Sequence, residues 1–136
     1  MRSIALLLIG AAIVGCATTA AQQPIRTAKA QQRYDQLLAG KVAGPPVSCL
    51  PTYHQDDMVV IDEQTVAFRQ GSSRVYVNHM QGGCMGIDHG RNALVTRTPG
   101  PTLCRGDIAQ VVDTLNGMQV GSCVWGDFVP YVRPKT

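Results

Sequence analysis

The stretch that decides the fold covers residues 57–80, DMVVIDEQTVAFRQGSSRVYVNHM. It carries three runs of β-type residues, at 58–61, 65–69 and 74–79, separated by short polar segments that contain Asp, Gln, Gly and Ser. β-branched and aromatic residues favour strands, whereas these polar residues favour tight turns. In the third run, valines alternate with other residues at the two-residue period of a half-buried strand. The stretch therefore predicts a β-meander.

Further short runs of the same kind follow toward the C-terminus. They lie at 93–98, 108–115, 118–120 and 125–132. Asn116-Gly117 is a hairpin signal, and Pro130 suits an edge position because proline donates no hydrogen bond to a neighbouring strand. Closely spaced short strands are typical of all-β domains. We expect a mainly all-β domain, barrel-like or a sandwich, of about six to seven short strands.

One segment before the strands has helical periodicity. Residues 28–39 are rich in helix formers, and their apolar side chains recur at helical spacing on one face: Ala30, Tyr34, Leu37 and Leu38. Thr27 can cap the start of this helix, and Gly40 can end it. We therefore expect a single domain over residues 28–136 that begins with a short helix at 28–39.

The N-terminus has the pattern of an export signal. Arg2 precedes an uncharged apolar run at residues 4–14, which suits a secretory leader and is short of the about 20 residues of a membrane span. The residues before Cys16, Ile-Val-Gly, resemble the lipobox of bacterial lipoproteins. That resemblance implies cleavage of a signal peptide at 1–15, a diacylglyceryl group on the Cys16 thiol and an acyl chain such as palmitate on the new N-terminus. Residues 16–27 would then form a flexible tether. Ala17 in place of Asp implies the outer membrane, facing the periplasm.

Four cysteines remain once Cys16 is set aside, at positions 49, 84, 104 and 123. An even number in an exported chain of this size predicts two disulfides. The gaps of 35, 20 and 19 residues do not match the short spacing of cysteine metal sites. The spacing of the four cysteines leaves all three possible disulfide pairings open.

Charge gives no support for a nucleic-acid partner. The chain of 136 residues has 12 Lys and Arg against 9 Asp and Glu, and loss of Arg2 with the leader would reduce its net charge from +3 to +2. The basic residues are scattered rather than clustered, unlike a nucleic-acid footprint.

Several segments together resemble a family of small bacterial envelope lipoproteins of unknown function. They are AGPPVSCL, VIDEQTVAFRQGSSRVYVN, GGCMG, LCRGDIAQVVD and GSCVWGDFVPY, within residues 33–133. The family carries no assigned activity, so the resemblance implies no catalytic residue. Its members that lack two of the four cysteines keep the equivalents of Cys84 and Cys123. The resemblance therefore implies Cys84–Cys123 and Cys49–Cys104, with Cys49–Cys123 and Cys84–Cys104 as the alternative.

Metal-ligand types occur in the middle of the chain without a recognised spacing. They are His54, Asp56, Asp57, His79, Asp88 and His89. A metal site needs three or four converging side chains, and the glycines around Asp88 and His89 indicate a loop. We interpret these residues as solvated loop residues and predict no metal and no cofactor.

No catalytic motif stands out either. The chain lacks G-x-S-x-G, and its serines at 72, 73 and 122 lie in turn-like or Cys-flanking segments. Asp107, Asp113 and Asp127 offer carboxylates, but Asp107 follows a glycine and suits a turn-forming role. We interpret the tripeptide at 105–107, Arg-Gly-Asp, as structural, and Trp125, Phe128 and Tyr131 as core aromatics.

These observations predict an exported, non-catalytic lipoprotein. It would be attached to the membrane through Cys16 and would serve envelope structure or bind an envelope protein or cell-wall component. The alternative is a small periplasmic hydrolase or metal-binding protein.

Overall fold

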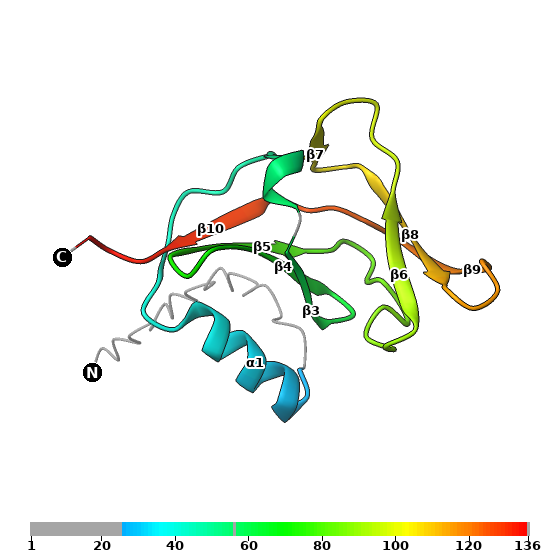
Figure 1. The fold of residues 1–136 in the computed structure, drawn as a ribbon, viewed down its shortest axis with the longest axis horizontal. Helices are drawn as coiled ribbons and strands as arrows, with labels where there is room; N and C mark the ends of the chain where they lie inside the picture. The colour runs from blue at the N-terminus through cyan, green and yellow to red at the C-terminus, as the bar shows by residue number, and fades with distance from the viewer. Residues whose placement is uncertain (1–25, 56, 136) are drawn as a thin grey trace, which may run out of the picture.

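The computed structural model describes residues 26–55 and 57–135, and the leader, Cys16 and most of the expected tether lie outside this part. The described chain contains one α-helix, one 3-10 turn and ten strands (Figure 1). The helix α1 spans Ala28–Leu38, and the 3-10 turn η1 spans Thr52–His54. The strands are β1 (Val42–Ala43), β2 (Cys49–Pro51), β3 (Met58–Asp62), β4 (Thr65–Gln70), β5 (Arg74–His79), β6 (Asn92–Thr96), β7 (Thr102–Cys104), β8 (Ile108–Asp113), β9 (Gln119–Val124) and β10 (Phe128–Val132).

The prediction of a mainly β domain is confirmed, with ten strands in place of six or seven. The additional strands β1, β2 and β7 have two or three residues each, too few to show a period in the sequence. The sheets are antiparallel and have five, two and three strands. In the part of the chain that the structure describes, they do not close into a barrel.

The five-stranded sheet has the order β1-β10-β5-β4-β3. The expected meander forms its β3-β4-β5 side, with Phe68 paired to Met58 on one side and to Tyr76 on the other. The C-terminal strand β10 then adds to β5, where Pro130 faces Tyr76. Pro130 therefore lies in an inner strand, and the prediction of an edge position was wrong. The two-residue strand β1 covers the outer side of β10.

The three-stranded sheet has the order β6-β8-β9 and lies at the opposite end of the molecule from β1 (Figure 1). Strands β8 and β9 form the hairpin expected at Asn116-Gly117, where Gly117 has a φ of +71°. This backbone conformation suits glycine because it has no Cβ. The extended β-run expected at 108–115 ends at Asp113, and the hairpin turn begins there.

The main core lies between the five-stranded and three-stranded sheets. Val66, Phe68 and Phe128 enter it from the first sheet, and Ala109 and Val111 enter it from the second. Trp125 joins the two groups, because its ring stacks near Phe128 with centroids 6.0 Å apart and its Nε1 donates to Thr96 Oγ1 on β6. Trp125 and Phe128 are therefore core residues, as predicted.

Helix α1 covers the other face of the five-stranded sheet (Figure 1). Tyr34, Leu37 and Leu38 pack against a cluster that contains Val75 and Val77. The Oγ1 of Thr27 accepts a hydrogen bond from the Ala30 amide, the expected N-cap. Helix α1 has 11 residues, and no described helix has both the length and the apolarity to cross a membrane.

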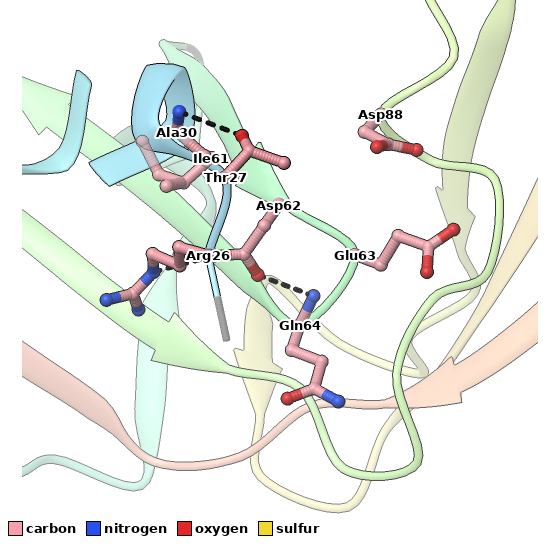
Figure 2. Close-up of a pocket in the computed structure, with 8 residues that line it drawn as sticks. All are labelled: Arg26, Thr27, Ala30, Ile61, Asp62, Glu63, Gln64 and Asp88. Atoms are coloured by element: carbon pink, nitrogen blue, oxygen red, sulfur yellow. Dashed lines mark hydrogen bonds and ion pairs between the residues drawn. The ribbon is translucent and has the colours of Figure 1, made fainter. Parts of the chain in front are cut away.

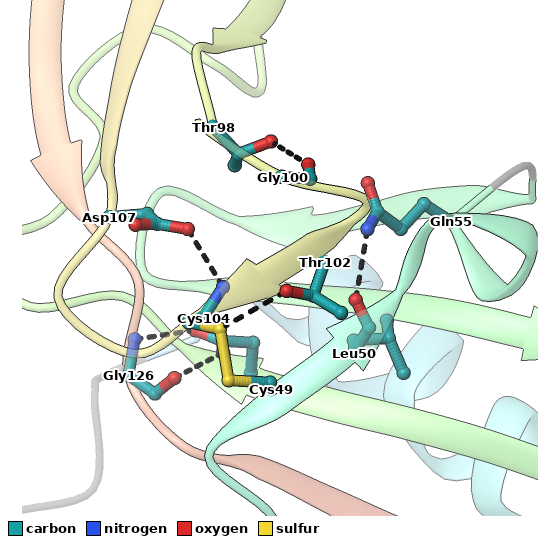
Figure 3. Close-up of a disulfide and its surroundings, with 10 residues drawn as sticks. Cys49, Leu50, Gln55, Thr98, Gly100, Thr102, Cys104, Asp107 and Gly126 are labelled. Carbon is teal, nitrogen blue, oxygen red and sulfur yellow. Dashed lines mark hydrogen bonds between the residues drawn. A yellow bond between two sulfur atoms is a disulfide. The ribbon is translucent and has the colours of Figure 1, made fainter.

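Two disulfides cross-link the irregular parts of the described chain. Cys49–Cys104 joins the paired strands β2 and β7 (Figure 3), and Cys84–Cys123 joins the loop after β5 to β9. These are the pairs that the family resemblance implied. The alternative pairs, Cys49–Cys123 and Cys84–Cys104, are not formed. Cys84 and Cys123 are buried in the main core, whereas Cys49 is exposed.

Candidate functional site

The site with the richest chemistry is a pocket of about 270 Å³ beside the start of α1 (Figure 2). Its lining comes from the N-terminal segment, the β3–β4 turn and the loop that precedes β6. The lining residues are Arg26, Thr27, Ala30, Ile61, Asp62, Glu63, Gln64 and Asp88. Arg26 and Asp62 lie on one side of the pocket, and Glu63 and Asp88 lie on the other (Figure 2).

The Arg26 side of this pocket is already occupied by protein contacts. Its side chain is only 8 % exposed, and its guanidinium donates through Nε to Asp62 Oδ2 at 2.7 Å and through Nη2 to Thr65 Oγ1 at 2.9 Å. It also lies 4.2 Å from the centre of the Tyr34 ring, within cation–π range. Arg26 therefore attaches the chain before α1 to the sheet, and the folded domain begins before residue 28.

The opposite side holds three metal-ligand types. Glu63, Asp88 and His89 each bring one ligand atom to within 4.8 Å of the others. Glu63 is fixed in place because its Oε1 accepts the Gly86 amide at 2.7 Å and its carbonyl accepts the Cys84 amide. These two hydrogen bonds hold the loop that carries Asp88 and His89 against the β3–β4 turn, and the Cys84–Cys123 disulfide ties the same loop to β9.

This cluster has the donor set that divalent metals accept. Its ligands would be two carboxylates and an imidazole, and the His89 Nε2 to Asp88 Oδ1 distance is 3.7 Å. Three protein ligands with an open fourth position are typical of zinc sites that bind water or a substrate. Asp88 and His89 are exposed, so an ion would be reachable from solvent.

The remaining predicted ligands do not join this cluster. Asp57 forms a bidentate ion pair with Arg69, and Asp56 lies outside the described residues. His54 lies in η1 beside Tyr76. His79 contacts Thr65 Oγ1 through Nδ1 at 3.4 Å. Burial lowers the pKa of His79, the nearby Arg26 lowers it further, and Asp62 acts in the opposite direction.

The carboxylates considered for catalysis have structural partners. Asp107 Oδ2 accepts the Cys104 amide at 2.8 Å and closes the turn before β8 (Figure 3). Asp113 is buried and pairs with Arg91 at 3.0 Å. Asp127 pairs with Arg105 at 3.2 Å. Both charged residues of the tripeptide at 105–107 therefore make contacts within the folded domain.

Sequence reasoning missed Glu63 and Arg26 as members of this site. Glu63 lies in the segment 62–64, which the sequence identified only as a turn. Its distance from Asp88 along the chain hides the contact, and no local pattern signals it. Arg26 stands near the end of the expected tether, before the helical pattern begins.

The fold and the site define a small, disulfide-bonded, antiparallel β protein with one covering helix. The chain belongs to a family of unknown function (DUF6491), which matches residues 1–123. Comparisons with curated proteins and with solved structures find no match.

Proposed function

We propose that this protein is an exported lipoprotein, anchored in the envelope membrane through Cys16, whose β domain has a structural or binding role without catalysis. The lipobox-like sequence Ile-Val-Gly-Cys at 13–16 carries the proposal. A lipidated cysteine with two or three acyl chains gives stable membrane attachment, whereas one chain gives only marginal binding.

The two disulfides support export. Disulfides persist in oxidising compartments such as the periplasm and are rare in a reducing cytosol. Cys84–Cys123 is buried in the main core, so the domain depends on it for its packing. The four cysteines of the described chain pair with one another, which supports a separate role for Cys16.

The contacts of the candidate catalytic groups support a role without catalysis. All four cysteines of the described chain are in disulfides, and no free thiol is left there to act as a nucleophile. Asp107, Asp113 and Asp127 are engaged in turn or ion-pair contacts. A nucleophile beside an oriented base, which hydrolases need, is not assembled among these groups.

Labelling with a fatty-acid analogue in growing cells tests the anchor. The wild-type protein should take up the label, and Cys16→Ser should lose it. The matched control is the double variant Cys49→Ser/Cys104→Ser, which should keep the label because its lipobox is intact. Undiminished labelling of Cys16→Ser would reject the lipoprotein assignment.

A second candidate function is divalent metal binding at Glu63, Asp88 and His89. The convergence of their ligand atoms within 4.8 Å favours it. Calorimetric titration with zinc should give saturable heat for the wild type and none for Asp88→Asn/His89→Ala. Asp57→Asn is the control, because this carboxylate pairs with Arg69 outside the cluster. Absence of heat with the wild type would eliminate this function.

A further inference from the structure

One face of the β6-β8-β9 sheet is not covered by the described chain. Leu94, Val111 and Ala109 turn toward the main core. Since paired residues share a face and neighbours along a strand alternate, the intervening residues point away from the core. They form an outer face with these members: Ala93, Val95, Ile108, Gln110, Val112, Gln119, Ser122 and Val124.

Five of these eight outer-face residues are apolar, three are polar, and none is charged. Ile108 is 61 % exposed and Val95 is 40 % exposed. Leu115, Met118 and Val120, in the adjoining turn and at the start of β9, are also exposed. Half of the ten large hydrophobic side chains that the described chain exposes therefore gather on this one sheet and its turn. Exposed apolar side chains that gather in one region are typical of interaction surfaces.

An arginine flanks each end of β6. Arg91 directly precedes β6 and Arg97 follows it, and both are exposed. Arg91 Nη2 pairs with the buried Asp113 carboxylate at 3.0 Å, so Arg97 is the arginine that adds positive charge beside the outer face. An apolar surface with arginines at its margin matches a bilayer interface, where apolar side chains enter the acyl boundary and cations meet anionic headgroups.

The length of chain before Arg26 keeps the domain close to a membrane. Nine residues separate Cys16 from Arg26, so the chain can span at most about 36 Å between them. A domain of this size has a radius of gyration of about 13 Å. Any face of the domain can therefore reach the bilayer that holds the Cys16 lipid, and the effective concentration of that surface is high.

We propose that the outer face of the β6-β8-β9 sheet docks on the membrane to which the protein is anchored. The inference rests on the proposed lipid anchor and adds which surface contacts the bilayer. Ile108 and Val95 enter the acyl boundary, and Arg97 meets lipid phosphates. Helix α1 packs on the five-stranded sheet and lies outside the docking face (Figure 1).

Fluorescence quenching by brominated lipid tests this orientation. The full-length lipidated protein is reconstituted into phosphatidylethanolamine–phosphatidylglycerol vesicles, with or without bromine on the acyl chains. The reporter is Ile108→Trp, and the control is Gln32→Trp on the exposed side of α1. The native Trp125 gives a constant background because it is 2 % exposed. Emission from Trp at position 108 should fall strongly in brominated vesicles, and emission from position 32 should not change.

Flotation of the same vesicles separates the two proposals. Protein that floats without quenching at position 108 keeps its anchor and overturns the docking proposal. Failure to float would overturn the anchor and the docking proposal together. A blue-shifted emission at position 108 without quenching, with a dimer in analytical ultracentrifugation, would assign the face to a second copy and also overturn docking.

Discussion

The two larger sheets of this protein differ in how their second faces are treated. Each sheet turns one face to the main core. The five-stranded sheet buries its other face under α1, where Val75 is 1 % exposed. The three-stranded sheet leaves Val95 at 40 % exposure on its other face. Valine thus contributes buried packing in the five-stranded sheet, whereas in the three-stranded sheet it is exposed and can make contacts.

The five-stranded sheet is therefore the covered sheet, and the three-stranded sheet is the open sheet. The covered sheet contains the strands with the clearest sequence pattern. Its helix is capped by Thr27 at the start and by Lys41 at the end, and Arg26 attaches the start of the helix to the sheet. The open sheet depends on the core aromatics and on Cys84–Cys123 for its position.

Loss of the buried disulfide should have the largest effect. Cys84→Ala/Cys123→Ala should lower the free energy of unfolding by about 4–5 kcal/mol, because it removes a long-loop constraint and buried sulfur packing. Cys49→Ala/Cys104→Ala should cost about 3–4 kcal/mol, since Cys49 is exposed. Urea unfolding under oxidising conditions measures both. A smaller loss for the buried pair would contradict the role given to it.

Removal of the aromatic link between the sheets should come next. Trp125→Ala should cost about 3–5 kcal/mol, because it opens a cavity between β6 and β10. Trp125→Phe is the control that keeps a ring and loses only the Nε1 hydrogen bond to Thr96, at a cost of about 1–2 kcal/mol. Far-ultraviolet circular dichroism during urea unfolding measures both. Equal losses for the two variants would mean that the ring itself contributes little.

A matched pair of valines compares the two faces directly. Val75→Ala, under α1, should cost about 2 kcal/mol for the methyl groups that it removes from the core. Val95→Ala, on the open face, should change stability by less than about 0.5 kcal/mol. Similar losses at both positions would show that something covers the open face in the free protein.

The titration of His79 should have the smallest effect. Its pKa in the folded protein lies below its ordinary value of 6.5, chiefly through burial. As the pH falls below about 6.5, His79 takes up a proton more readily in the unfolded chain than in the folded protein. The free energy of unfolding that this residue contributes above that pH is therefore lost. Because His79 keeps an exposed edge, His79→Gln should remove only a small part of the loss of stability between pH 7.5 and 5. A steeper pH dependence in His79→Gln would contradict this sign.

The local patterns of the sequence predict the repeated features of the fold and miss its long-range contacts. Alternation along 74–79, the turn at 71–73 and the cap at Thr27 are local, and each appears in the structure. The pairing of β10 with β5 is absent from any local pattern, because it depends on how the two sheets close over the core.

The candidate site was predicted less completely for the same reason. Asp88 and His89 were identified as ligand types, but their partner Glu63 lies in a turn 25 residues earlier in the chain. Only the disulfide-held loop brings the three side chains together. The open face was hidden too, because an alternating strand pattern does not reveal which residues another element covers.

The central claim is that lipidated Cys16 anchors an exported, disulfide-bonded β domain. Intact-mass spectrometry of the protein purified from the cell envelope tests it most directly. The predicted mass is that of a chain beginning at Cys16, with residues 1–15 removed, acyl groups added and four cysteines oxidised. A mass that retains residues 1–15, or that begins elsewhere and carries no lipid, would contradict the claim.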